Sequence, residues 1–101
     1  MESIKMSAVI DGLRYDTEKS QLIASDAYWD GSNWERRGRN KFLFLTENGR
    51  YFVQVLTRWQ GERDHLEALT QDAAITLWEN DLPEHEVEFE KAFPGVEIKE
   101  A

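Results

Sequence analysis

The residues with the clearest binding chemistry lie between Tyr28 and Lys41, in the segment YWDGSNWERRGRNK. This segment combines tryptophans with a run of arginines and is too polar and glycine-rich for a regular core element. Arginine and tryptophan are enriched at protein interface hot spots, and both can also hold nucleic acid by stacking on bases and pairing with phosphate. We therefore predict a binding surface formed by these residues: Trp29, Trp34, Arg36, Arg37, Arg39, Arg58 and Trp59.

The same residues have a structural interpretation. Trp34 and Trp59 could cap an exposed sheet face while the arginines pair with acidic side chains of the C-terminal half. An exposed, tryptophan-rich face would also allow self-association.

Charge is distributed unevenly along the chain, which carries 20 acidic and 12 basic residues and a net charge of −8. Residues 34–63 contain seven basic and three acidic residues, whereas residues 64–101 contain eleven acidic residues and only two lysines. The whole molecule is too acidic to be attracted to nucleic acid or anionic lipid, so a basic protein partner is favoured over either. Nucleic-acid binding through the loop 28–41 remains the alternative.

The acidic half of the chain carries closely spaced carboxylates at Glu79, Asp81, Glu84, Glu86, Glu88 and Glu90. They could be presented to an arginine-rich groove, as in phage-encoded inhibitors that occupy nucleic-acid channels of host enzymes. The alternative is a solvated charged surface that keeps a small protein in solution.

Catalytic chemistry has little support in the sequence. The two histidines, His65 and His85, stand outside any HExxH or Ser-His-Asp pattern, and the glycines are too isolated for a phosphate-binding loop. Cysteine is absent, which removes disulfides, thiolate metal sites and cysteine nucleophiles. We expect no enzyme activity, no metal and no cofactor.

A β-hairpin over residues 41–57 is the strongest structural signal, because KFLFLT and YFVQVLT flank Asn48-Gly49. Asn-Gly as a two-residue loop suits a type I′ turn and would place Leu45 opposite Phe52. Phe42, Phe44, Val53 and Val55 would then share one face, and Leu43, Leu45, Phe52 and Leu56 the other. Because both faces are apolar, the hairpin should lie in the middle of a covered sheet.

Shorter elements should surround this hairpin. Residues 8–10, 13–15 and 21–24 predict a meander leading into it, with a turn at Asp11-Gly12, and residues 65–68 predict another strand. Thr70 is a good N-cap for a helix over 71–80 whose Leu77 and Trp78 face the sheet. An extended piece near Val87 and a helical turn up to Phe93 should follow.

The chain should thus be a single α+β domain over residues 1–101. We predict an antiparallel sheet of four or five strands around the Asn-Gly hairpin, one main C-terminal helix on one face, and a short helical turn near the C-terminus. The opening MESIKMSAVIDG lacks the features of a secretory signal, and no run approaches a membrane span. A cytoplasmic location without membrane contact is the expectation.

One resemblance rests on three groups of residues: Tyr15-Asp16-Thr17-Glu18, then Phe44-Leu45-Thr46 with Asn48-Gly49 and Tyr51-Phe52, then Glu67-Ala68-Leu69-Thr70 before Ala73-Ala74. In these signals the chain resembles small uncharacterised proteins, domains of unknown function, from bacteria, phages and plasmids. The resemblance implies a fold and a mobile-element context, and it assigns no functional residue. Together with the charge pattern, it leads us to expect a non-catalytic protein-binding module, an accessory or inhibitor acting on a host protein complex.

Overall fold

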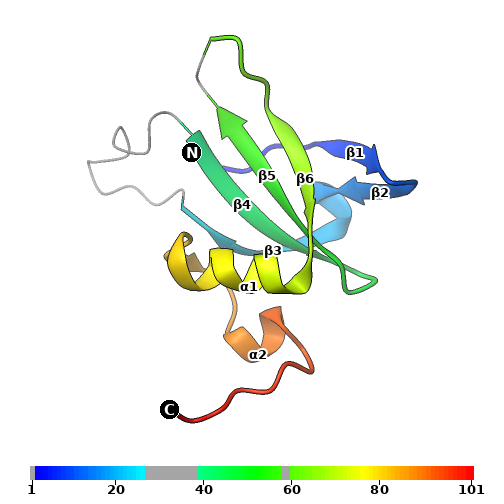
Figure 1. Ribbon diagram of the computed structural model, residues 1–101. Helices are drawn as coiled ribbons and strands as arrows, with labels where there is room; N and C mark the ends of the chain where they lie inside the picture. The colour runs from blue at the N-terminus through cyan, green and yellow to red at the C-terminus, as the bar shows by residue number, and fades with distance from the viewer. Residues whose placement is uncertain (1, 27–38, 58–59) are drawn as a thin grey trace.

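The computed structural model describes residues 2–26, 39–57 and 60–101 (Figure 1). The elements are, in chain order, β1 (Ser7–Ile10), β2 (Leu13–Asp16), a 3₁₀ turn (Thr17–Lys19), β3 (Ser20–Ser25), β4 (Arg39–Thr46), β5 (Tyr51–Thr57), β6 (His65–Leu69), α1 (Gln71–Asn80), β7 (Glu84–His85) and α2 (Phe89–Ala92). Five strands form one antiparallel sheet in the order β6-β5-β4-β3-β7. The predicted α+β class is confirmed, with one main helix and a short C-terminal helix.

The first two strands differ from the predicted meander, because β1 and β2 pair only with each other. Asp11 and Gly12 both have positive φ, 52° and 79°, as a two-residue type I′ turn requires. Ala8 and Tyr15 lie opposite each other in this hairpin and pack onto the main sheet through its buried aromatic residues. The hairpin therefore covers a face of the sheet instead of extending it.

The two central strands pair one residue away from the predicted register. Leu45 lies opposite Tyr51 and Phe44 opposite Phe52, with their rings stacked at 5.0 Å. The loop between them has three residues, because the N–H of Thr46 donates to the carbonyl of Arg50, and Gly49 alone has positive φ within it. The predicted two-residue turn is therefore wrong.

This one-residue shift moves the side chains of β5 to the opposite face from the one predicted, because strand side chains alternate. Phe52 and Leu56 share a cluster with Phe42 and Phe44, while Tyr51 shares the other cluster with Leu43.

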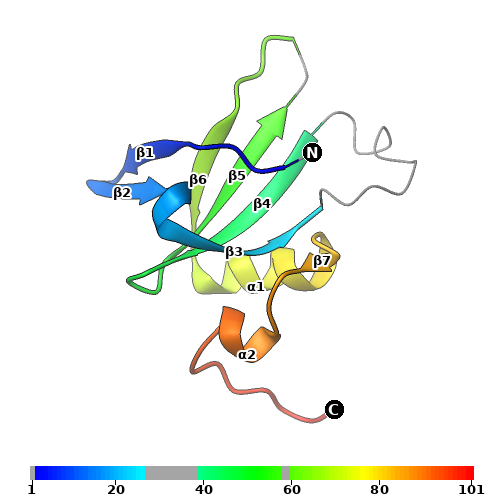
Figure 2. The same ribbon diagram turned by 180° about the vertical axis from the view of Figure 1, so that it is seen from behind.

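Both faces of the sheet are covered, as the apolar strands predicted. On one face α1 and α2 enclose a core of Ile23, Ala24, Leu43, Tyr51, Ala74, Trp78, Leu82, Ala92 and Phe93. On the other face the β1-β2 hairpin encloses a core of Tyr15, Phe42, Phe44, Phe52, Leu56 and Leu66. Figure 2 shows this hairpin from behind, with the N-terminal segment running across the strands beside it.

The segment after α1 is extended earlier than predicted. The extended pair is Glu84–His85, whereas Val87 lies in a bend, and α2 occupies the position of the predicted helical turn. A β-bulge in β3 between Leu22 and Ala24 accompanies this arrangement. The strand pairing of β3 with β7 covers two residue pairs, and the carbonyl of the intervening Ile23 accepts from the N–H of Glu86 at 2.9 Å just beyond them.

Candidate functional site

Most of the predicted binding surface lies outside the described residues. This applies to Trp29, Trp34, Arg36, Arg37, Arg58 and Trp59. The prediction therefore stays a prediction for these six residues, and only Arg39 can be placed.

Arg39 begins β4 and forms a two-point ion pair with Glu62. Its Nε donates to Glu62 Oε1 at 3.0 Å, and its Nη2 donates to Oε2. Thr57 Oγ1 donates to the same Oε1 at 2.8 Å. These hydrogen bonds, with that of Arg39 the largest cause, lower the pKa of Glu62 to about 2. Arg39 therefore helps to join β4 to the loop that precedes β6.

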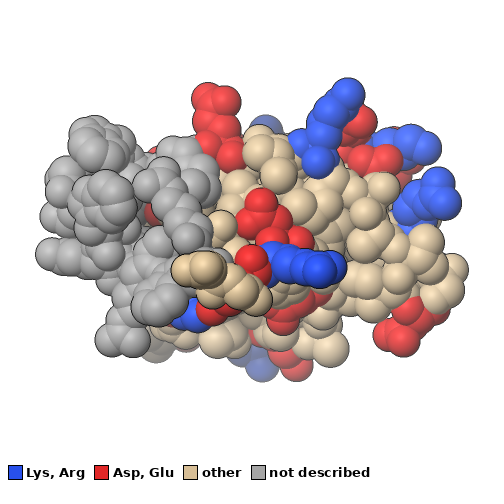
Figure 3. All heavy atoms as spheres, turned by 90° about the horizontal axis from the view of Figure 1, so that it is seen from above, with Lys and Arg blue, Asp and Glu red and all other residues tan. Residues whose placement is uncertain are grey.

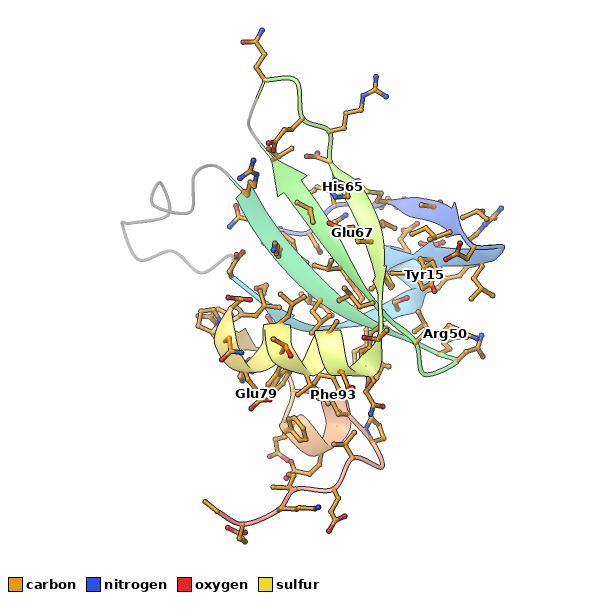
Figure 4. All side chains as sticks on the ribbon, in the orientation of Figure 1. Tyr15, Arg50, His65, Glu67, Glu79 and Phe93 are labelled. Carbon is orange, nitrogen blue, oxygen red and sulfur yellow. The ribbon has the colours of Figure 1, made fainter. Side chains whose placement is uncertain are left out.

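The edge strand β6 carries a smaller charged pair. Nδ1 of His65 donates to the carbonyl of Arg63 at 2.9 Å, and Nε2 lies 2.9 Å from a carboxylate oxygen of Glu67. Both acceptors stabilise the protonated ring, with the bond to the Arg63 carbonyl the larger cause, and they raise the pKa of His65. His65 and Glu67 lie on β6, away from Glu79 on α1 (Figure 4).

The helix α1 positions the largest buried aromatic group of the C-terminal half. Thr70 caps it as predicted, accepting from the N–H of Ala73 at 3.1 Å, and the helix ends at Asn80. Ala74 and Trp78 are one turn apart and both are buried against the sheet. Leu77 packs at the margin of the same core. The predicted helix and its sheet-facing side are confirmed.

His85 lies directly on Trp78. The two rings stack with centroids 3.7 Å apart and an interplanar angle of 16°. Nε2 of His85 also lies 3.0 Å from the carbonyl oxygen of Trp78. Because a carbonyl can only accept, Nε2 carries the proton of this hydrogen bond, which holds the His85 ring of β7 against α1. The result is an aromatic platform with an exposed imidazole on its outer side.

Two open hollows lie beside this platform. One, of about 320 Å³, is lined by the C-terminal end of α1 together with Leu82, Pro83 and His85. The other, of about 550 Å³, is lined by Trp78, His85 and residues 86–89. Phe89, which also lines the second hollow, packs edge-on against Trp78 with the ring centroids 6.3 Å apart. Both hollows therefore have an aromatic wall.

Exposed carboxylates surround the platform and the hollows. They belong to Glu79, Asp81, Glu86 and Glu88, and together with Trp78 and His85 we call them the acidic face. Within the part of the chain that the structure describes, none of these four carboxylates lies in an ion pair. Their negative charge is therefore available to a partner.

The electrostatics of α1 add to this charge. A helix carries partial negative charge at its C-terminal end, where a nearby cation is stabilising and an anion is not. The last turn of α1 contains no basic residue and instead holds Glu79, and Asp81 caps the helix. A cation bound here would offset both the carboxylates and the helix end.

The opposite end of the molecule has a different charge pattern. Figure 3 views the end remote from α2, and among the described residues the basic and acidic side chains there lie side by side. The acidic face belongs instead to α1 and the segment that follows it. Part of the excess of acidic residues in the C-terminal half therefore lies on α1 and the segment that follows it.

Comparison with models of protein families, with curated proteins and with solved structures finds no match to this chain. Among residues 2–26, 39–57 and 60–101, no three histidine or carboxylate side chains are placed to hold a metal ion together. None of the described helices is long and apolar enough to span a membrane. The function must therefore be inferred from the chain's own geometry.

The sequence predicts the carboxylates of this site but not the platform that they flank. It predicts that Trp78 faces the sheet, which is correct, and for His85 it indicates only a surface or hydrogen-bonded histidine. The two residues meet because Leu82 and Pro83 turn the chain back over the end of α1. Only the Leu82-Pro83 break hinted at that reversal.

Proposed function

We propose that this chain is a non-catalytic protein-binding module that docks a basic segment of a partner protein on its acidic face. The observation that carries the proposal is the Trp78–His85 platform, flanked by hollows and by four carboxylates without ion-pair partners among the described residues. Lysine and arginine side chains have an apolar stem and a charged head, and aromatic faces attract cations.

Each component of the acidic face suits contact with a lysine or arginine side chain. The exposed side of the His85 ring offers a flat surface for an arginine or lysine stem. Glu79 and Asp81 offer carboxylates beside the first hollow, and Glu86 and Glu88 offer them beside the second. A planar guanidinium can pair with a carboxylate through two hydrogen bonds, which gives direction as well as attraction. The preferred partner is thus an arginine-rich surface.

This partner class suits the mobile-element context that the resemblance implied. Arginine-rich surfaces occur where proteins hold nucleic acid, and an acidic module can occupy such a groove in place of the nucleic acid. We therefore propose an accessory or inhibitory protein that acts on a host complex. Direct nucleic-acid binding through the loop 28–41 stays a prediction.

The experiment is capture of proteins from nuclease-treated lysate of the source organism with three forms of the chain. The wild type is compared with a face variant, Glu79→Gln, Asp81→Asn and Glu86→Gln. A matched control variant, Glu2→Gln, Asp11→Asn and Glu47→Gln, loses the same charge from exposed positions elsewhere. Bound proteins are identified by mass spectrometry.

The proposal expects one partner to be recovered by the wild type and the control variant and lost by the face variant. Its recovery should fall as salt rises, because the contacts are charged and exposed. Equal recovery by all three forms would contradict the acidic face as the binding surface. Recovery of the partner from untreated lysate but not from nuclease-treated lysate would favour the alternative function.

A further inference from the structure

The edge strand β6 has backbone groups that nothing in the described structure pairs with. The N–H of Thr57 donates to the side chain of Asp64, so the N–H of Thr57 points toward the β6 side of β5. Because the backbone N–H and C=O groups of successive residues point to alternate sides of a strand, those of Val55, Val53 and Tyr51 also point toward β6. Their register partners in β6 are His65, Glu67 and Leu69.

The intervening residues of β6 must point the other way. Leu66 and Ala68 direct their N–H and C=O groups away from β5, at the outer edge of the sheet. Within the described residues these groups have no hydrogen-bond partner. Such a row of alternating donors and acceptors is a template for one more extended strand.

A roof of apolar side chains projects past this edge. The tip of the β1-β2 hairpin reaches beyond β6 in both Figure 1 and Figure 2. By strand alternation Ile10 and Leu13, next to the tip, point to the same side as the inward-packed Ala8 and Tyr15. Ile10 is partly buried against the core on this face, whereas Leu13 is 38% exposed.

We infer that the edge of β6 is a docking site for an extended segment of a partner protein, which adds to the sheet as a sixth strand beneath the β1-β2 hairpin. The open backbone row of Leu66 and Ala68 would receive its hydrogen bonds. Ile10 and Leu13 would cover alternate side chains of the added strand. This site lies at the opposite edge of the sheet from β7 and the acidic face, and it does not depend on the function proposed there.

The geometry also specifies the occupant. On the hairpin side, apolar side chains of the added strand would fill the space under the roof and cover the exposed Ala68. On the other side, the side chains of the added strand would lie beside His65 and Glu67, so polar residues fit there. The segment should therefore alternate apolar and polar residues. A second copy of this chain fits less well, because its own hairpin would project into the same space across the two-fold axis.

The test uses a defined probe, an eight-residue peptide of alternating valine and threonine with blocked ends, added to ¹⁵N-labelled protein. We expect the amide signals of Leu66 and Ala68 to shift and their hydrogen exchange to slow. A control peptide with two consecutive prolines at its centre should have no effect, because proline removes the donors that the ladder needs. Shifts confined to the acidic face, or no shifts, would overturn the inference.

Three variants separate docking from unfolding. Ala68→Pro removes an outward N–H at an edge position, where proline is tolerated, and should weaken the peptide affinity about fivefold or more. Leu13→Glu should weaken it comparably by charging the roof. Val9→Glu, on the outer side of the same hairpin and 62% exposed, is the matched control and should leave binding unchanged. Binding that is unaffected by both Ala68→Pro and Leu13→Glu in folded protein would contradict the inference.

Discussion

The two faces of the five-stranded sheet are closed by different kinds of cover. One face is covered by helices, whose backbone groups bond within the helix, and its core is aromatic and aliphatic. The other is covered by a short hairpin and by the extended N-terminal segment, whose backbone needs partners from elsewhere. Gln54 supplies them although it is fully buried: its Nε2 donates to the carbonyl of Ile4 at 2.8 Å, and its Oε1 accepts from the Ile4 N–H at 3.3 Å.

The difference shows what each cover demands of the sheet. A helix can rest on an apolar surface, whereas an extended segment requires polar side chains beneath it, because buried backbone groups are costly when unpaired. Thr17 does the same for Met6, accepting from its N–H at 3.0 Å. A helical cover makes no such demand, so the outer surface and the C-terminal end of α1 can carry charged side chains.

The largest expected effect is on the helical face. Trp78→Ala should lower the free energy of unfolding by about 3–5 kcal/mol, because it removes a buried ring that packs against His85, Phe89 and Phe93. Denaturant unfolding measures the loss. Hydrogen exchange of the folded variant should rise in α1 and α2 more than in β1 and β2. A uniform rise would contradict the placement of Trp78 in the helical cover alone.

On the hairpin face, Gln54→Leu should lower the free energy of unfolding by about 1–3 kcal/mol, because the Ile4 N–H loses its acceptor and the Ile4 carbonyl keeps only the donor from Thr17. Gln21→Leu, at an exposed position of β3, is the control and should cost little. Amide exchange at residues 4–6 should increase in the first variant only. If it does not, the N-terminal segment is held by something other than this amide.

A smaller effect is expected for Tyr51→Phe. The buried hydroxyl of Tyr51 donates to the carbonyl of Ala92 at 2.7 Å and holds α2 against the sheet. Removal of this hydroxyl should lower the free energy of unfolding by about 1–2 kcal/mol and leave the ring packing intact. Urea unfolding measures the cost, and the exchange rate of Phe93 reports on α2. An unchanged stability would mean that water replaces the lost donor.

The smallest effect concerns pH. Because folding lowers the pKa of Glu62 from 4.5 to about 2, its contribution to stability is present above pH 4.5 and is lost as the pH falls toward 2. Between those values the melting temperature of the wild type should fall more steeply than that of Glu62→Gln. The difference should shrink in high salt, since the pair with Arg39 is exposed. Parallel curves would argue against the ion pair.

Local patterns predicted much of this fold, and the exceptions have physical causes. The apolar strands, the Thr70 cap and the helix at 71–80 depend on neighbouring residues, so they could be predicted. The register of β4 and β5 could not, because Asn48-Gly49 fits a two-residue turn and a three-residue loop, and both faces of the hairpin are apolar. At Asp11-Gly12 the same kind of signal did give the two-residue turn.

The candidate site was predictable only in part. Its carboxylates follow from composition, but the stacking of His85 on Trp78 depends on a chain reversal that no periodic pattern encodes. The buried role of Gln54 was equally hidden, since a glutamine among apolar residues has no local signature of its distant partner Ile4.

The most direct test of the acidic face is zero-length carbodiimide cross-linking of the captured complex, which joins carboxylates to lysines in contact. The account predicts cross-links from Glu79, Asp81 or Glu86 to a basic segment of the partner, located by mass spectrometry. Cross-links only from carboxylates outside the acidic face, such as Glu2 or Glu47, would contradict it.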